Sequence, residues 1–175
     1  MKKIIFYIAL IIVIIISCKT NSNTNDSKKL AIVFESKSNT TTTGIATFIE
    51  KNGTVTFVAK IAGLKPGIHA IHIHEKSDCT ASDGSSAGGH WNPTFKKHGK
   101  WGDVEYHKGD IGNFIADEKG NGTITLTTTE WCIGCGDATK DILGKGLIVH
   151  AGADDFVTQP SGNAGARVAC SAIIK

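Results

Sequence analysis

The chain has 175 residues, of which 41% are hydrophobic and 20% charged, and its formal net charge at pH 7 is +3. This apolar content excludes a chain that is disordered throughout, and one compact domain is the expectation for this length. Of the 19 basic residues only Arg167 is an arginine, so the sequence lacks the arginine-rich patch typical of nucleic-acid binding, and no nucleic-acid partner is expected.

The first segment is typical of an export signal. Lys2 and Lys3 precede an unbroken apolar run over residues 4–16, which is shorter than the ~20 residues of a membrane-spanning helix. The run ends in Ile-Ile-Ser-Cys, which resembles the lipobox of bacterial lipoproteins, with Cys18 as the residue that is acylated after cleavage. An ordinary secretory signal with an incidental cysteine is the alternative. We predict a lipoprotein signal peptide over residues 1–17 and a lipid on Cys18.

Export of such a lipoprotein places the protein at a bacterial membrane, on the periplasmic or the cell-surface side. Residues 19–29 are polar and contain no aliphatic side chain, so residues 18–29 are predicted to form a flexible tether ahead of a domain over residues 30–175. Disulfides persist outside the cytosol. The four cysteines that remain after Cys18 are Cys79, Cys132, Cys135 and Cys170, an even number.

From Leu30 onward, short apolar segments separated by Gly- and Asn-containing turns predict β-strands. Asn52-Gly53 is a hairpin signal because both residues tolerate positive φ, and residues 118–122 carry a second one. No segment has an apolar period of 3.6 residues. The predicted strands cover residues 30–34, 45–49, 54–58, 68–74, 112–116, 123–128, 147–150 and 167–174. Eight short strands predict an all-β fold, an eight-stranded Greek-key β-barrel or sandwich.

Two connections between these strands are long, over residues 75–110 and 151–166. Long loops inside a compact β domain are usually functional or disordered. The first one contains three histidines and several aspartates, which indicates a ligand-binding role.

Histidines on the predicted strands form a candidate metal site. His72 and His74 lie two residues apart, so they project from the same face of a strand, ~7 Å apart along the chain. His150 closes another predicted strand. Three imidazoles held by rigid strands suit copper or zinc.

The longer connection supplies a complete set of zinc ligands, namely His90, His98, His107 and Asp110. Three neutral imidazoles and one carboxylate form a closed tetrahedral set, which is typical of structural zinc. A solvated histidine-rich surface loop is the alternative, but it leaves the carboxylate beside the third histidine unexplained. A copper ion on the three strand histidines has room for one more imidazole, and one histidine shared by both metals would supply it.

Taken together, seven segments resemble the copper/zinc superoxide dismutase family. They follow that family's order across nearly all of residues 30–175, and their joint occurrence is specific, whereas any one of them alone would be weak. The segments are GIHAIHIHE, DCT, GGHWNP, KKHG, HKGDIGN, LIVHAGADD and GNAGARVAC. The resemblance implies a Greek-key β-barrel of eight strands. It also implies disproportionation of superoxide to dioxygen and hydrogen peroxide by Cu(II)/Cu(I) cycling, with one copper and one structural zinc ion per subunit.

The same resemblance implies roles for individual residues. Copper would be held by His72, His74, His90 and His150, and zinc by His90, His98, His107 and Asp110. His90, shared by both metals, would deliver a proton to the forming peroxide. Arg167 would receive the anion beside copper. Asp154 would orient one copper and one zinc histidine, and His69 would anchor a loop by hydrogen bonding.

The resemblance further implies a disulfide between Cys79 and Cys170. The Cys132-Ile-Gly-Cys135 motif, in contrast, is not part of the family's general pattern. Such a pair can be redox-active or half of a metal site, and a local disulfide is the interpretation we favour because no second motif of this kind is present.

The second long loop lacks the charged run of the animal and plant branch and resembles the bacterial exported branch. A lipid-anchored copper- and zinc-binding protein without turnover is the alternative function, and its hallmark would be a missing arginine or an incomplete ligand set. The sequence is compatible with a homodimer and does not decide between monomer and dimer.

Overall fold

The computed structural model describes residues 27–175. The predicted signal peptide, Cys18 and most of the predicted tether lie outside these residues. No helix within residues 27–175 is long and apolar enough to cross a membrane.

All eight predicted strands are present, with ends that differ from the predicted ones by a few residues. They are β1 (Lys28–Ser36), β2 (Thr43–Lys51), β3 (Thr54–Ala62), β4 (Gly67–His74), β5 (Gly112–Ala116), β6 (Gly122–Thr128), β7 (Lys145–His150) and β8 (Arg167–Ile173). The helical content of the described residues is a single 3₁₀ turn, η1 (Ser85–Ala87). The all-β prediction is therefore confirmed.

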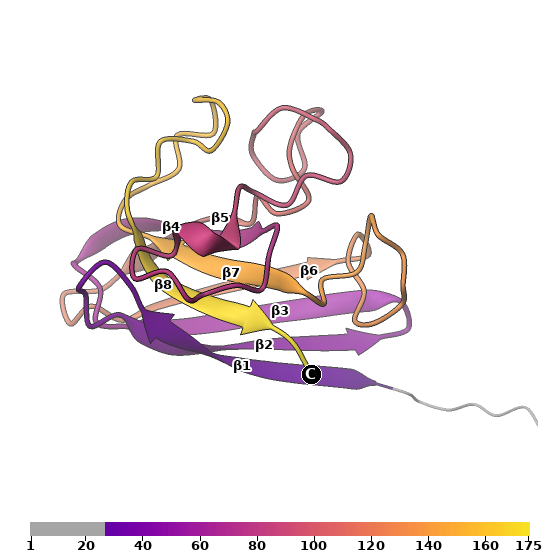
Figure 1. Ribbon diagram of the computed structural model, residues 1–175, viewed down its shortest axis with the longest axis horizontal. Coiled ribbons are helices and arrows are strands. Elements are labelled where there is room, and N and C mark those ends of the chain that lie inside the picture. The colour runs from indigo at the N-terminus through magenta and orange to yellow at the C-terminus, as the bar shows by residue number, and fades with distance from the viewer. Residues whose placement is uncertain (1–26) are drawn as a thin grey trace, which may run out of the picture.

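The strands form one closed antiparallel barrel in the order β1-β2-β3-β6-β5-β4-β7-β8 (Figure 1). The pairing of β3 with β6 and of β4 with β7 requires connections that skip strands, which is the Greek-key pattern. The β2–β3 hairpin turns at Asn52 and Gly53, whose φ angles are 51° and 73°. Both values lie in the left-handed region, as the Asn-Gly signal predicts.

The first strand begins earlier than the sequence indicates. Lys28 and Lys29, which the sequence analysis placed in the tether, pair with Glu50 and Ile49 of β2. The Lys28 ammonium lies 3.3 Å from the Glu50 carboxylate and donates a hydrogen bond to the backbone oxygen of Ile133 at 2.9 Å. Two consecutive lysines are typical of a solvated segment, and only these partners, remote in sequence, make them part of the barrel.

The barrel interior is filled by the inward side chains of every strand. Phe48, Phe57 and Trp131 pack ring against ring, with centroid distances of 5.0 to 6.3 Å. On β4, Ile71 and Ile73 are fully buried in this core. Because side chains alternate along a strand, the residues between and after them project from the outer face of the barrel.

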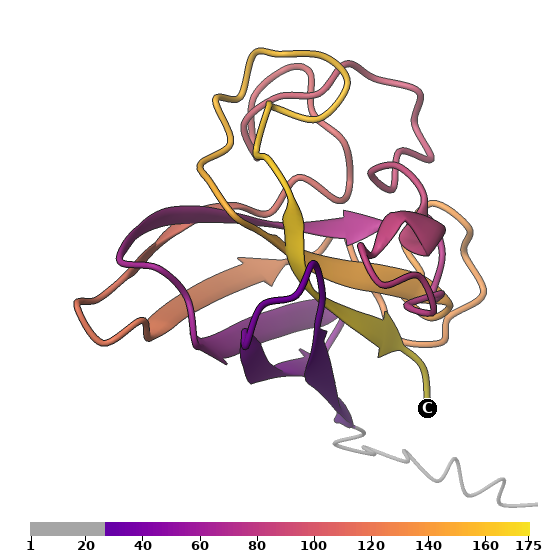
Figure 2. The same ribbon diagram turned by 60° about the vertical axis from the view of Figure 1, so that its left-hand side comes forward.

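The two long connections cover that outer face. Residues 75–111 join β4 to β5, and residues 151–166 join β7 to β8. Figures 1 and 2 show both connections rising from the same side of the barrel, above β4 and β7. This placement buries polar side chains on the outside of a sheet, which solvent would otherwise reach.

Candidate metal centre

Two groups of buried ligand atoms lie under the long connections, and within each group all atoms are within 4.8 Å of one another. The first group consists of His72, His74, His90 and His150, and the second of His90, His98, His107 and Asp110. All seven side chains are buried. His90 belongs to both groups, so the structure brings together every residue that the sequence analysis assigned to copper and zinc.

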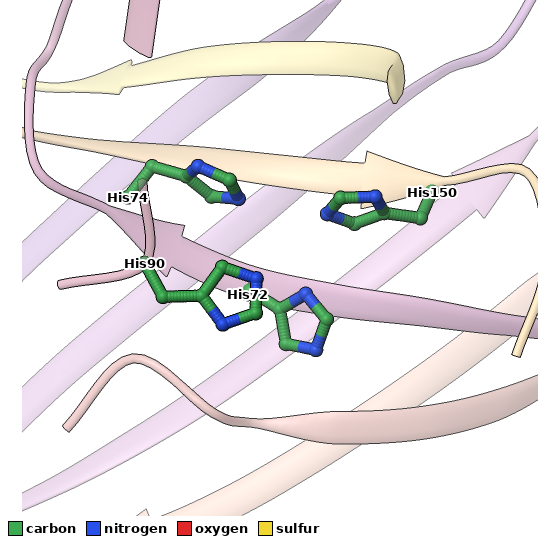
Figure 3. A group of neighbouring side chains, drawn as sticks. All are labelled: His72, His74, His90 and His150. Carbon is green, nitrogen blue, oxygen red and sulfur yellow. The ribbon is translucent and has the colours of Figure 1, made fainter. Parts of the chain in front are cut away.

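Strand pairing positions the first group. His72 and His74 lie on β4, and the antiparallel neighbour β7 ends in His150. His90 is held beside them because it forms an isolated β-bridge with His74. The His72 ring centroid lies 4.1 Å from that of His90 and 4.9 Å from that of His150. Figure 3 shows the four rings gathered over the two strands.

Six ring nitrogens in the two groups make no hydrogen bond of good geometry, although two of them, on His98 and His107, lie within 3.3 Å of the Asp110 carboxylate. They are His72 Nδ1, His74 Nε2, His90 Nε2, His98 Nδ1, His107 Nδ1 and His150 Nε2. These are all the unpartnered buried side-chain nitrogen and oxygen atoms of residues 27–175. A buried polar atom without a partner costs about 1 to 3 kcal/mol, and a bound metal ion removes that cost. The residues therefore fit two metal ions.

The opposite nitrogen of each ring, except in His90, faces an oxygen that fixes its tautomer. The contacts are His72 Nε2 to Asp154 Oδ2 at 2.8 Å, His98 Nε2 to Asp154 Oδ1 at 2.9 Å, His74 Nδ1 to Gly88 O at 2.9 Å, His107 Nε2 to Lys96 O at 3.1 Å and His150 Nδ1 to Gly165 O at 3.3 Å. Because these oxygens can only accept, each of the five nitrogens carries the proton. In a neutral ring the other nitrogen is then a free lone pair, which is the form that binds a metal.

His90 joins the two groups through its two nitrogens. Its Nδ1 lies 2.8 Å from Asp110 Oδ1, and its unpartnered Nε2 belongs to the all-histidine group. The Asp110 carboxylate is also 3.0 Å from His98 Nδ1 and 3.3 Å from His107 Nδ1. Three imidazole nitrogens thus converge on one carboxylate, the donor set that tetrahedral zinc prefers.

The surroundings hold the ligands in their metal-binding protonation states. Burial lowers the pKa of His90 to about 4, and burial together with the neighbouring histidines lowers the pKa of His74 and His150. Burial alone would raise the pKa of Asp110, but its contacts with His107, His90 and His98 bring it well below its usual range. At neutral pH these imidazoles are uncharged and the carboxylate is ionised.

His98 behaves differently in the metal-free chain. Burial alone would lower its pKa, but hydrogen bonds and ion pairing with Asp110 and Asp154 raise that pKa to about 9. Without metal, the proton on His98 neutralises part of the carboxylate charge. A zinc ion at this position would displace that proton and take over its electrostatic role.

Arg167 lies at the start of β8, beside the all-histidine group. Its guanidinium is half-buried and donates hydrogen bonds of 2.7 Å to the backbone oxygens of Gly84 and Gly88. It lines an open cavity of about 700 Å³ together with His74, His90 and His150. Burial lowers its pKa from the ordinary value, yet an arginine side chain stays charged in proteins. A fixed positive charge thus faces the cavity beside three of the four histidines.

A disulfide between Cys79 and Cys170 ties the loop that carries Gly84 and Gly88 to β8. Cys170 lies only three residues after Arg167 on this strand, so the disulfide fixes the loop close to the guanidinium that it holds. The second disulfide joins Cys132 to Cys135.

The remaining residues from the sequence analysis lie close to the centre without joining a ligand group. Asp154 contacts one histidine of each group. His69 places its two ring nitrogens 2.8 Å from the backbone oxygens of His150 and Lys65, so it connects the β3–β4 loop to the end of β7.

Sequence reasoning missed three residues that hold the centre in place. The backbone oxygen of Gly88 accepts hydrogen bonds from both His74 and Arg167. Asn113 brackets Asp154, accepting its N–H and donating to its backbone oxygen, both at 2.8 Å. For Gly88, the available signal in the sequence was the pair of glycines before His90, because Gly88 has a φ of 78°, which favours glycine. Lys37, whose ammonium donates to the backbone oxygen of Cys79, carries no sequence signal.

A closed Greek-key barrel with two buried donor sets that share one histidine defines a dinuclear metalloprotein of the all-β class. Comparison with known proteins agrees with this class. Residues 42–173 match the family model described as copper/zinc superoxide dismutase (SODC). The chain is 36% identical over 130 residues to "Superoxide dismutase [Cu-Zn] 2" of Brassica juncea, which covers 71% of this chain and 83% of that protein.

A solved structure is similar as well. The crystal structure of the clock protein EA4 superposes with a TM-score of 0.72 at 34% sequence identity, covering 82% of this chain and 92% of that one. The chain therefore belongs to the copper/zinc superoxide dismutase family and is an oxidoreductase of that kind.

Proposed function

We propose that the chain disproportionates two superoxide anions to dioxygen and hydrogen peroxide. Copper would be held by His72, His74, His90 and His150, and zinc by His90, His98, His107 and Asp110. The observation that carries the proposal is His90, whose Nδ1 lies in one donor set and whose Nε2 lies in the other. Copper, when bound, supplies the one-electron change between Cu(II) and Cu(I), whereas zinc has no redox chemistry and is structural.

The protein prepares the histidines for this chemistry before a metal arrives. Five of the six rings have one nitrogen held by an oxygen on the side away from the metal, so each ring already points its other nitrogen at the metal position. Among these five, His98 has its pKa raised to about 9 and must first release a proton. Neutral imidazoles also accept a metal of either charge without strongly favouring the higher one. A set of this kind suits an ion that changes its charge in each half of the reaction.

Arg167 would capture the anion. Two of its five N–H donors are occupied by the backbone oxygens of Gly84 and Gly88, which hold the guanidinium in place while leaving other donors free. A planar guanidinium is better suited than an ammonium to hold a small oxyanion. Because Arg167 lines the same cavity as His74, His90 and His150, an anion bound to it lies beside the all-histidine group.

His90 would act in proton delivery. Its Nε2 has no protein partner, while its Nδ1 is held in the second donor set. The ring can therefore carry a proton on Nε2 without losing its position. His90 also lines the cavity in which Arg167 would hold the anion, so the proton donor lies next to the acceptor.

We also propose that the protein is an exported bacterial lipoprotein, anchored to a membrane through Cys18 on the periplasmic or cell-surface side. The lipobox-like segment supports this assignment, and so does the presence of two disulfides, Cys79–Cys170 and Cys132–Cys135, because disulfides persist in oxidising compartments.

A superoxide-consumption assay on purified chain of known copper and zinc content tests the enzymatic proposal. We expect many superoxide anions to be consumed per chain, with activity proportional to copper. Consumption that stops after one equivalent per copper would instead support the alternative, a lipid-anchored metal-binding protein without turnover.

A further inference from the structure

A third group of candidate ligand atoms lies outside the histidine centre. The sulfur atoms of Cys132 and Cys135 and a carboxylate oxygen of Asp141 are within 4.8 Å of one another. They lie in the connection between β6 and β7, at the end of the barrel where β1 begins (Figure 1). The two cysteines form a disulfide in the structure, so the group binds no metal in this oxidised form.

The loop that carries this group is held in place without the disulfide. Trp131 and Ile142, at its two ends, are buried in the barrel core, and so is Ile133 between the cysteines. The Cys132 N–H donates to Lys140 O at 2.9 Å, and its backbone oxygen accepts from Ile142 N–H at 3.1 Å. A disulfide that closes so short a ring constrains the unfolded chain little. Reduction should therefore leave the fold intact and the two sulfur atoms side by side.

The carboxylate of Asp141 is fixed next to the sulfur atoms. It accepts hydrogen bonds from the N–H groups of Gly134 and Gly136 at 2.9 Å and of Leu143 at 3.1 Å. Burial alone would raise the pKa of Asp141, but these donors and nearby Lys28 lower it. The carboxylate is therefore ionised at neutral pH.

The two disulfides differ in accessibility. Cys135 is exposed, whereas Cys170 is fully buried and its partner Cys79 is half-buried. A thiolate of a small dithiol can attack the Cys135 sulfur, form a mixed disulfide and displace the Cys132 thiolate. The second thiol of the reductant then releases Cys135. The protein gains two electrons and two protons, and the dithiol becomes a disulfide.

We propose that the reduced Cys132 and Cys135, together with Asp141, form a second zinc-binding site. Two thiolates and one carboxylate leave a fourth position for water on the exposed side, which completes the tetrahedral geometry of zinc. Zinc binding releases the two thiol protons. Two ammonium groups lie close to this loop: Lys28, which donates to Ile133 O and also pairs with Glu50, and Lys175, which lies beside Gly134. Exchange with a small-molecule disulfide re-forms the Cys132–Cys135 bond and reduces that disulfide to a dithiol, which expels zinc because no thiolate ligands remain. Zinc occupancy of this site therefore depends on the thiol–disulfide state.

The test begins with protein whose histidine centre is saturated with copper and zinc. The sample is treated anaerobically with a dithiol, freed of reductant, equilibrated with zinc and freed of unbound metal. Metal analysis should then find one more zinc per chain than in the untreated protein. Cadmium in place of zinc should give the ultraviolet absorption of cadmium–thiolate bonds. Alkylation and peptide mapping of the reduced protein should label Cys132 and Cys135 and leave Cys79–Cys170 intact.

Three variants assign the site. The Cys132→Ser/Cys135→Ser double variant should gain no zinc under the same treatment. Asp141→Asn should weaken zinc binding about tenfold or more. Asp137→Asn, a change at an exposed carboxylate of the same loop, should leave it unchanged. No additional zinc in the reduced protein, uptake that survives in the double serine variant, or labelling of Cys79 and Cys170 in place of the other pair would each overturn the proposal.

Discussion

The carboxylate of Asp154 offers the sharpest test of how the centre is held together. Its two oxygens face three donors: His72 Nε2 at 2.8 Å, His98 Nε2 at 2.9 Å and the Phe156 N–H at 2.7 Å. Asp154→Asn keeps the shape of the side chain and replaces one acceptor oxygen with an NH₂ donor. The side chain is buried, so water cannot compensate for the mismatch.

The structure predicts which histidine suffers. Oδ1 of Asp154 accepts from both His98 and Phe156, whereas Oδ2 accepts only from His72. The amide oxygen of the variant should therefore stay with His98 and Phe156, and the NH₂ group should face His72. If His72 keeps its proton on Nε2, two donors oppose each other. If the proton moves to Nδ1, the lone pair that copper needs is lost.

The magnitude follows from the lost hydrogen bond. A hydrogen bond to a charged, buried group contributes about 1.5 to 3 kcal/mol. Since every 1.4 kcal/mol corresponds to a factor of ten, copper affinity should fall about 10- to 100-fold, as is typical when partners of metal-ligating histidines are changed. Zinc affinity should fall less, because His98 retains its acceptor.

Chelator competition, carried out separately for Cu(II) and Zn(II), measures both affinities. Thermal unfolding of the metal-free proteins checks that the fold is kept. Asp155→Asn is the matched control, since this neighbouring carboxylate is exposed and contacts only its own loop. Unchanged copper affinity in Asp154→Asn, an equal loss for both metals, or the same loss in the control would refute the reasoning.

Four further predictions address the rest of the molecule. Arg167→Lys should retain part of the superoxide-consuming activity, Arg167→Ala less and Arg167→Glu least, all at wild-type metal content, because the charge and shape of this side chain govern anion capture. Added salt should slow the wild type more than the alanine variant, and an equal salt effect on both would contradict this role. The Cys79→Ser/Cys170→Ser double variant should lower the free energy of unfolding by about 4 to 5 kcal/mol for a sequence separation of 91, as denaturant unfolding can measure. It should also lower activity at equal metal content, because the loop whose backbone oxygens hold Arg167 is released, and a loss of stability with unchanged activity would contradict this second effect. The metal-free protein should lose up to about 3 kcal/mol of stability through His90 alone as the pH falls from 6.5 to about 4, because His90 takes up a proton in the unfolded chain over this range but not in the folded one. Urea unfolding at several pH values across this range measures the change, and a stability that does not vary with pH would contradict the prediction. Cys18→Ser should move the protein from the membrane to the soluble fraction with its activity intact, and intact-mass analysis of the wild type should find acyl chains; membrane association that survives the change would argue against lipidation.

Local patterns in the sequence were enough for much of the fold. Each strand alternates inward apolar side chains with outward ones, and this alternation depends only on the geometry of an extended chain. The Asn52-Gly53 turn follows from the left-handed conformation that both residues tolerate. The same geometry placed His72 and His74 on one face of a strand.

Other features depend on contacts between residues that are far apart in the sequence. Lys28 joins the barrel only because Glu50 and the backbone oxygen of Ile133 are its partners. A pattern of neighbours along the chain contains no information about these partners, of which Ile133 is 105 residues away. This is why the start of β1 was placed two residues too late.

The centre shows the same division. Ligand counting along the sequence called for one histidine shared between two sites, and the family resemblance pointed to His90. Only the fold places its two nitrogens in different donor sets. The carbonyl of Gly88, which holds both His74 and Arg167, left little trace in the sequence, because every residue has a backbone oxygen and only tertiary packing decides what that oxygen accepts.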